Sequence, residues 1–251
     1  DNTAAPVLCR PFDHGAAITT YSTTKYIGGH GTTIGGLIVD GGNFDWGKAG
    51  ADRQPAMNTP DPCYGGVVWD EQVTKNMGLP FAYLLKLRTT LLRDLGGAMS
   101  PFNAWMFIQG LETLPLRMRE HAKNAQAVAE ALAANKKVQS VTYPGLFEGA
   151  EKEKADKYMT GGYGALIGFE LPGGKEAGSK FIDSLELLYH VANIGDSRSL
   201  AIHPATTTHS QLAPEEQLSA GVTPGYVRLS IGIENVEDII ADINQAIDKA
   251  S

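Results

Sequence analysis

The segment 226–251 combines a strand pattern with a helix pattern, and this pairing restricts the fold more than any other feature of the sequence. In YVRLSIGI, Val227, Leu229 and Ile231 alternate with other residues, as expected for a strand with one buried face. Asn235 then provides an N-cap for a helix with acidic residues in its first turn. The apolar stripe of that helix consists of Val236, Ile239, Ile240, Ile243, Ala246 and Ile247. A strand followed by an amphipathic helix predicts an α/β protein.

The same alternation of strand and helix patterns extends along the chain. The patterns predict strands at 17–21, 33–39, 138–143, 165–171 and 189–192, and helices at 81–95, 101–132, 151–158 and 175–187. Residues 47–66 are rich in Gly, Pro, Asn and Asp and are predicted to form a long loop. No internal repeat is found.

Pro115 lies inside the second helix pattern, where a proline should break or kink the helix. We therefore predict two domains. Residues 1–115 would be the C-terminal part of a larger α/β domain, and residues 116–251 would form a smaller C-terminal α/β domain.

Composition excludes several classes of partner. The 251 residues are 43% hydrophobic with a net charge of −7, and no basic stripe is present, so we expect neither nucleic acid nor an anionic membrane as partner. No apolar run approaches the roughly 20 residues that span a bilayer. Cys9 and Cys63 make no disulfide framework, so we expect a cytoplasmic protein. His30, His203 and His209 lack metal-ligand spacing, so no metal site is predicted.

The segment STTKYIGGHGTTIGG, residues 22–36, places one lysine between hydroxyl side chains and glycines. Hydroxyls and glycine amides bind phosphate, and a lysine beside them is either another phosphate ligand or a nucleophile. A phosphate-binding P-loop requires the lysine after its glycines, whereas Lys25 precedes them. The glycines also lack dinucleotide-fingerprint spacing.

Pyridoxal phosphate is the cofactor that fits this order, because it carries its own phosphate and forms a Schiff base with lysine. Lys25 would be the attachment point, and the Ser22 and Thr24 hydroxyls could bind the phosphate. Asp1 could pair with the pyridine nitrogen, because it precedes the lysine by about the length of a crossover between parallel strands.

Five longer phrases strengthen the pyridoxal-phosphate assignment: DNTAAPVLCRPFDHGA, STTKYIGGHG, SPFNAWMFIQGLETLPLRM, IGDSRSLAIHPATTTHSQL and GYVRLSIGIE. Together they resemble the Cys/Met metabolism family of pyridoxal-phosphate-dependent enzymes, over essentially the whole chain and in the same order. Within that family the chain looks most like O-acetylhomoserine sulfhydrylases. The resemblance implies the fold type I, aspartate aminotransferase-like architecture.

The resemblance also implies residue roles. Lys25 would be the Schiff-base lysine and the base that moves protons, and Asp1 would pair with the pyridinium nitrogen. Ser22 and Thr24 would bind the cofactor phosphate. Arg228 would hold the substrate α-carboxylate with its planar guanidinium, and Ser199 resembles a serine that lines the substrate and lysine region.

The implied reaction is γ-replacement. Acetate would leave O-acetyl-L-homoserine, and sulfide or a thiol would add to give homocysteine or methionine. The implied assembly is a homotetramer of catalytic dimers. A methionine γ-lyase or cystathionine γ-synthase type reaction, or an inactive fragment with a structural role, remains an alternative. Sulfide requires almost no distinctive side chain, so the sequence leaves the thiol donor open.

The chain also departs from the family pattern. The interval from Asp1 to Lys25 is one residue shorter than usual, Ala17 stands where aspartate is common, and Tyr21 stands where histidine is common. The resemblance further implies that an N-terminal third precedes Asp1 in the family. That part would carry further phosphate ligands and the aromatic residue that stacks on the cofactor ring.

Overall fold

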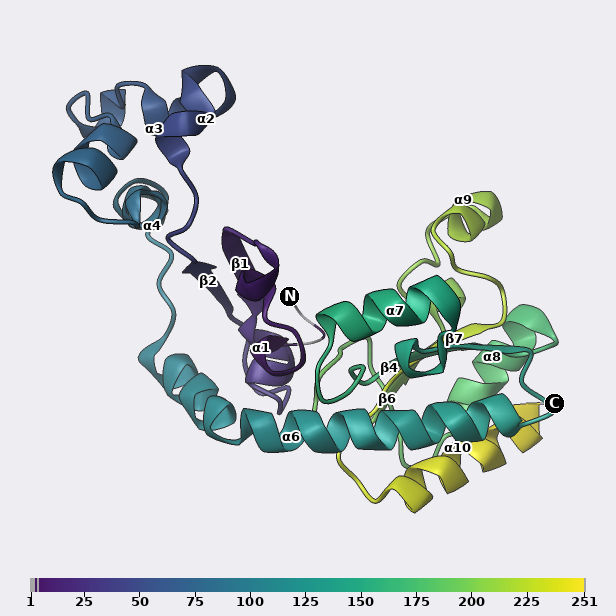
Figure 1. Cartoon of the computed structure of the whole chain (residues 1–251). Coiled ribbons are helices and arrows are strands. Elements are labelled where there is room, and N and C mark those ends of the chain that lie inside the picture. Colours follow the sequence, from purple (N-terminus) through teal and green to yellow (C-terminus); the bar gives the residue numbers. More distant parts are fainter. Residues whose placement is uncertain (1–2, 4, 251) are drawn as a thin grey trace. The chain divides into compact units, whose positions relative to one another are not determined.

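The computed structural model describes residue 3 and residues 5–250, which form two compact units (Figure 1). Within the described ranges, the first unit comprises Asp1–Arg10, Ser22–Gly35 and Trp105–Ser251, and the second comprises Pro11–Tyr21 and Gly36–Ala104. Each unit is built from both strands and helices, so the predicted α/β composition is confirmed.

The first unit is organised around a five-stranded mixed sheet with the order β3-β4-β7-β6-β5. Its strands are β3 (Ser140–Thr142), β4 (Leu166–Glu170), β7 (Tyr226–Ser230), β6 (Leu200–Ile202) and β5 (Tyr189–His190). Among the described strands of this sheet, only the β5–β6 pair is parallel. The central pairing of β4 with β7 sets Gly168 opposite Arg228, while Val227 and Leu229 are completely buried. The alternation in YVRLSIGI therefore places Arg228 between two core residues, as predicted.

Three helices with buried faces accompany this sheet: α6 (Pro101–Ala134), α8 (Gly174–Asp183) and α10 (Val236–Ala250). The predicted cap of α10 is confirmed, because the backbone N–H of Glu237 donates to Asn235 Oδ1 at 2.8 Å. The predicted stripe is largely buried, with Ile239 and Ile247 completely inaccessible. The Phe181 ring of α8 meets the Phe169 ring of β4 edge to face, with centroids 5.3 Å apart.

Helix α6 continues through Pro115 and does not end there. Figure 1 shows that α6 changes direction along its length, as a helix with an internal proline can. Buried apolar residues on both sides of the proline, including Phe107, Met118 and Leu132, explain why packing maintains one helix. The division into residues 1–115 and 116–251 remains a prediction.

The remaining helical elements complete the first unit. They are α1 (Ala5–Leu8), η2 (Thr23–Ile27), η6 (Pro144–Leu146), α7 (Gly149–Tyr158), η7 (Pro204–Thr206) and α9 (Pro214–Ser219). The predicted strands at 138–143, 165–171 and 189–192 and the helices at 151–158 and 175–187 are confirmed with altered bounds, whereas β6 and α9 were not predicted.

The second unit contains a two-stranded sheet, β1 (Ile18–Ser22) with β2 (Gly36–Asp40). Its helical elements are η1 (Pro11–His14), α2 (Trp46–Arg53), α3 (Pro55–Asn58), η3 (Pro62–Tyr64), η4 (Asp70–Asn76), α4 (Ala82–Lys86), η5 (Leu87–Leu92) and α5 (Arg93–Leu95). The last three form one continuous helical stretch that ends at Gly96 in the left-handed conformation, as the predicted glycine stop requires.

The expectation of an irregular loop at 47–66 was wrong, because this segment contains three short helices. Local capping accounts for them: Asp45 Oδ1 accepts the Lys48 N–H at 2.9 Å, and Pro55 and Pro62 begin the next two helices. The elements surround a small apolar core that includes Met57 and Trp69.

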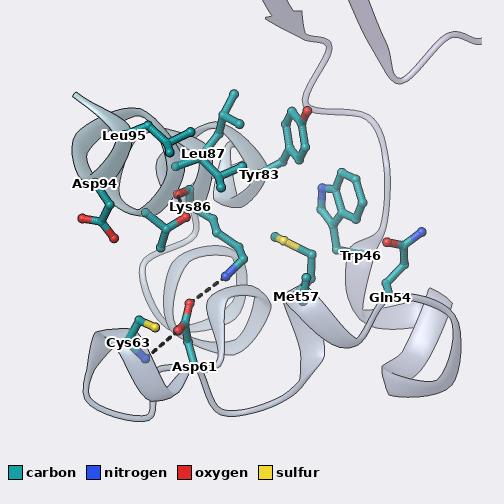
Figure 2. Close-up of a pocket in the computed structure, with 13 residues that line it drawn as sticks. Trp46, Gln54, Met57, Asp61, Cys63, Tyr83, Lys86, Leu87, Asp94 and Leu95 are labelled. Carbon is teal, nitrogen blue, oxygen red and sulfur yellow. Dashed lines mark hydrogen bonds and ion pairs between the residues drawn. The ribbon is translucent and has the colours of Figure 1, made fainter. Parts of the chain in front are cut away.

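An ion pair stabilises this core (Figure 2). Asp61 Oδ2 accepts from Lys86 Nζ at 2.6 Å and from Trp69 Nε1 at 2.8 Å, while Oδ1 accepts the Cys63 N–H at 3.0 Å. The bond from Lys86, followed by that from Trp69, lowers the Asp61 pKa to about 2. The pair lies beside a cavity of about 620 Å³ with mainly apolar walls, including Trp46 and Leu87. It connects η3 to the 82–95 helical stretch.

Among the described residues, no helix has the length and apolar character needed to cross a membrane.

His121 should make the stability of the protein depend on pH. Burial is the main cause that lowers its pKa to about 4, and its ring is completely inaccessible on α6. The unfolded chain takes up this proton near pH 6.5, so the free energy of unfolding should fall by about 3 kcal/mol as pH decreases from 6.5 to 4. Urea unfolding across this range tests the prediction. His121→Gln should flatten the dependence, and the exposed-residue control His190→Gln should not. Equal pH slopes in all three proteins would contradict it.

Candidate active site

Lys25 lies in η2, immediately after β1, where the chain passes from a strand into a short π-helical turn. Its own backbone is not helical, with φ −84° and ψ −131°. The side chain is half-buried between the buried residues Thr23 and Tyr26. The sequence pattern of hydroxyls followed by glycines thus produces an abrupt turn with the lysine at its centre.

Asn193 links Lys25 to Arg228, although the three residues are far apart in the sequence. Lys25 Nζ donates to Asn193 Oδ1 at 2.5 Å, and Arg228 Nη2 donates to the Asn193 backbone oxygen at 3.2 Å. The structure therefore brings together Lys25 and Arg228, which the sequence analysis selected for different roles. All three residues belong to the first unit.

The electrostatics of this cluster favour a reactive amine. Burial is the main cause that lowers the Lys25 pKa, and the positive charge of Arg228 lowers it further. Burial also lowers the Arg228 pKa. A lysine whose charged form is destabilised is more readily converted to the neutral nucleophile.

Arg117 on α6 fixes the turn that follows Lys25. Its buried guanidinium donates to the Tyr26 oxygen at 2.8 Å and to the Ile27 oxygen at 3.3 Å, as well as to the Gly110 oxygen at 2.7 Å. Gly110 is required for this close approach, because a Cβ atom there would lie 2.3 Å from the Ile27 oxygen. The turn is therefore held by α6 through both hydrogen bonds and close packing.

The segment after Asn193 is fastened to the same turn. The Ser197 N–H and Oγ both donate to the Gly29 oxygen, at 2.9 and 2.8 Å. Gly195, with φ +72°, approaches Tyr26 so closely that a Cβ atom would lie 2.6 Å from the Tyr26 nitrogen. Its N–H donates to Ser230 Oγ on β7. These contacts fix the position of Asn193 relative to Lys25 and Arg228.

The predicted phosphate ligands lie on either side of Thr23. Ser22 is half-buried at the end of β1, and Thr24 Oγ1 accepts the Gly35 N–H at 3.0 Å. Thr23 Oγ1 is buried without a hydrogen-bond partner in the described part of the chain. Asp1 lies outside the described residues.

Ser199 occupies a different environment from the lysine cluster. It is completely buried, its Oγ donates to Glu234 Oε2 at 2.9 Å, and it accepts the Gly232 N–H at 2.8 Å. Its N–H also donates to Glu234 Oε1. Both hydroxyl interactions connect the segment before β6 to the segment after β7. A substrate role for Ser199 remains a prediction.

Asn193 was not selected from the sequence. The phrase IGDSRSLAIHPATTTHSQL, which carries much of the resemblance, begins one residue after it. An asparagine two residues before a glycine is typical of many turns, so the local pattern does not distinguish it. Its role depends on tertiary contacts. Over residues 3 and 5–250, the structure contains no group of three or more His, Cys, Asp or Glu side chains able to hold a metal ion.

Comparison with known proteins identifies the family. The sequence model of Cys/Met metabolism PLP-dependent enzymes matches residues 1–248. The chain belongs to this family, and the prediction of a pyridoxal-phosphate-dependent enzyme family is confirmed.

Two curated relatives are similar over almost the whole chain. An O-acetyl-L-homoserine sulfhydrylase of Leptospira meyeri is 52% identical over 252 residues, covering 98% of this chain and 56% of the relative. A homocysteine synthase of Schizosaccharomyces pombe is 49% identical over 243 residues, covering 97% of this chain and 55% of the relative. The chain therefore spans little more than half the length of these relatives.

A solved structure supports the fold. The crystal structure of a candidate O-acetylhomoserine (thiol)-lyase from Campylobacter jejuni matches 99% of this chain with a TM-score of 0.89 and 40% identity, over 57% of that chain. It contains N′-pyridoxyl-lysine-5′-monophosphate. The predicted fold class, that of a fold type I pyridoxal-phosphate enzyme, is confirmed.

Replacing Asn193 by aspartate should raise the Lys25 pKa. The substitution places a carboxylate 2.5 Å from the amine, where a neutral oxygen now accepts its hydrogen bond, and an opposite charge favours the ammonium form. We expect an increase of about 1 unit or more. The pH dependence of amine labelling at Lys25, followed by peptide mass spectrometry, measures it. Asn43→Asp makes the same charge change at an exposed site. An equal shift in both variants would contradict a direct contact.

Proposed function

We propose that the protein containing this chain catalyses γ-replacement on O-acetyl-L-homoserine with sulfide or a thiol, releasing acetate and forming L-homocysteine or methionine. The C–O bond at Cγ breaks and a C–S bond forms at the same carbon. The relatives named O-acetyl-L-homoserine sulfhydrylase and homocysteine synthase support this substrate and product. The reaction belongs to methionine biosynthesis.

The described residues fit pyridoxal phosphate. Lys25 supplies a partly buried amine with a lowered pKa, and a buried Thr23 hydroxyl without a partner lies beside the predicted phosphate ligands Ser22 and Thr24. Asp1 remains the proposed partner of the pyridine nitrogen. When bound, the cofactor supplies the electron-withdrawing ring that makes the substrate Cα and Cβ protons acidic.

Lys25 and the side chains around it would have separate roles in the reaction. Lys25 Nζ would hold the cofactor before substrate arrives and would then move protons at Cα and Cβ. Arg228 would bind the substrate α-carboxylate through its guanidinium, because a planar fork matches a carboxylate. Asn193 would hold the Lys25 amine and the Arg228 guanidinium in fixed positions relative to each other, since it accepts a hydrogen bond from each. Ser199 is proposed to support the substrate region.

The single observation that carries this proposal is the convergence of Lys25, Asn193 and Arg228. The Lys25 amine, whose pKa is lowered, and the Arg228 guanidinium donate to two different oxygens of one asparagine, which supports roles for both in binding one substrate. An α-amino acid requires both groups, one for the reacting carbon and one for its carboxylate.

We further propose a cytoplasmic homotetramer built from catalytic dimers. The exposed apolar side chains of α6 support association, since Trp105, Ile108 and Leu116 are each more than half exposed.

Cofactor fixation and product analysis test the function. In the full-length protein, borohydride reduction with pyridoxal phosphate should label Lys25, and O-acetyl-L-homoserine with sulfide should give homocysteine. Lys25→Ala should abolish both, whereas the surface variant Lys75→Ala should retain both. Release of a keto acid without thiol addition would indicate a lyase, and a preference for cysteine as acceptor would indicate cystathionine formation. A folded full-length protein without label or product would support the inactive alternative.

Arg228→Lys should weaken substrate binding without preventing cofactor attachment. Lysine retains the charge but loses the bidentate geometry, so we expect kcat/KM for O-acetyl-L-homoserine to fall on the order of 100-fold, mainly through KM. Steady-state kinetics measure the change, and peptide mapping confirms that the Lys25 label persists. Arg53→Lys, at an exposed position, provides the control. An unchanged KM would rule out carboxylate binding by Arg228.

A further inference from the structure

A cavity of about 430 Å³ lies in the first unit, formed by α6, η6, α7 and the glycine-rich segment before β4. Its volume is in the range of small-molecule sites. The residues that line it are Arg119, Ala122, Lys123, Gln126, Tyr143, Gly145, Lys152, Gly161, Gly162 and Tyr163. None of them belongs to the Lys25 cluster.

The charge of this cavity is opposite to that of the protein. Arg119, Lys123 and Lys152 line it and no lining residue is acidic, although the chain carries a net charge of −7. Arg119 forms no ion pair or side-chain hydrogen bond with any residue that the structure describes. A guanidinium with all its donors available matches a phosphate or carboxylate geometrically.

Three carboxylates lie near these cations. Asp156 accepts from Lys152 Nζ at 2.5 and 2.6 Å and from the Tyr163 hydroxyl at 2.6 Å, so it neutralises Lys152. Glu120 pairs with Lys123 at 3.1 Å, but both side chains are largely exposed and such pairs are weak. Glu130 accepts from the Gln126 amide. Arg119 and Lys123 therefore supply the donors available to a ligand.

The glycine-rich segment adds backbone donors. Gly161 and Gly162 have positive φ angles of 77° and 144°, and their N–H groups find no acceptor within the described residues. Gly162 also packs against α6, where a Cβ atom would lie 2.5 Å from the Ala122 Cβ. Backbone N–H groups without an internal acceptor remain available as donors to an anion in the cavity.

We propose that this cavity binds a small phosphate-bearing anion, held by Arg119, Lys123 and the amides of Gly161 and Gly162. The Tyr163 ring, which is half-buried, would contact its organic part. This site is separate from the proposed cofactor phosphate site beside Lys25, and its existence does not depend on the proposed reaction.

Titration calorimetry with inorganic pyrophosphate tests the proposal on the full-length, cofactor-loaded protein. The variant Arg119→Ala/Lys123→Ala should weaken binding at least tenfold. Lys154→Ala/Lys157→Ala is the matched control, since it removes two positive charges from the surface of α7 without altering the cavity lining. We expect less than a twofold change from it.

The position of the site is tested separately. Ser22→Ala/Thr24→Ala, which removes the proposed ligands of the cofactor phosphate, should retain pyrophosphate binding, and loss of binding in that variant would assign the anion to the cofactor phosphate site and overturn the proposal. The absence of saturable binding at millimolar pyrophosphate would overturn it too. Equal weakening in the two charge-removing double variants would do the same, because it would show only general charge attraction.

Discussion

The buried guanidinium of Arg117 is the interaction on which the lysine cluster depends. It donates to three backbone oxygens, from two residues of the turn after Lys25 and from Gly110 on α6. No carboxylate within the described residues pairs with it, so the three carbonyl oxygens and the Thr113 hydroxyl, which accepts from Nε at 3.2 Å, stabilise its charge. The arginine and the turn therefore stabilise each other, and the backbone position of Lys25 is fixed.

The lysine cluster also depends on contacts between residues that are far apart in the sequence. Lys25 and Asn193 are separated by 168 residues, and Asn193 and Arg228 by 35. The sheet holds Asn193 and Arg228 near each other, since β6, which follows Asn193 in the chain, pairs directly with β7, which contains Arg228. Ser197 and Gly195 then attach the Asn193 segment to the lysine turn and to β7. The site thus forms only when the five-stranded sheet and the α6 packing are both in place.

The sequence predicted the elements whose pattern directly reflects burial. β7 and α10 could be located because a period of 2 and a period of 3.6 report the buried face of each. The segment 47–66 was misjudged, because its low helix propensity was overridden by Asp45 and by prolines at helix starts. Lys25 and Arg228 were recognisable from residue type and family resemblance. Asn193 was not, since nothing local distinguishes it from a turn asparagine.

Because Asn193 is uncharged, one small site can combine a lysine with a lowered pKa and an arginine whose charge is available to a substrate. An acidic residue at this position would pair with Lys25 and hold it in the protonated form. It would also compensate Arg228, whose charge would then be less available to a substrate carboxylate. The amide oxygen accepts from Lys25 and the backbone oxygen accepts from Arg228, so both cations are oriented while neither is neutralised. The charge of Arg228 adds to burial in lowering the Lys25 pKa, which favours the free amine at Lys25, and Arg228 retains a binding site for an anion.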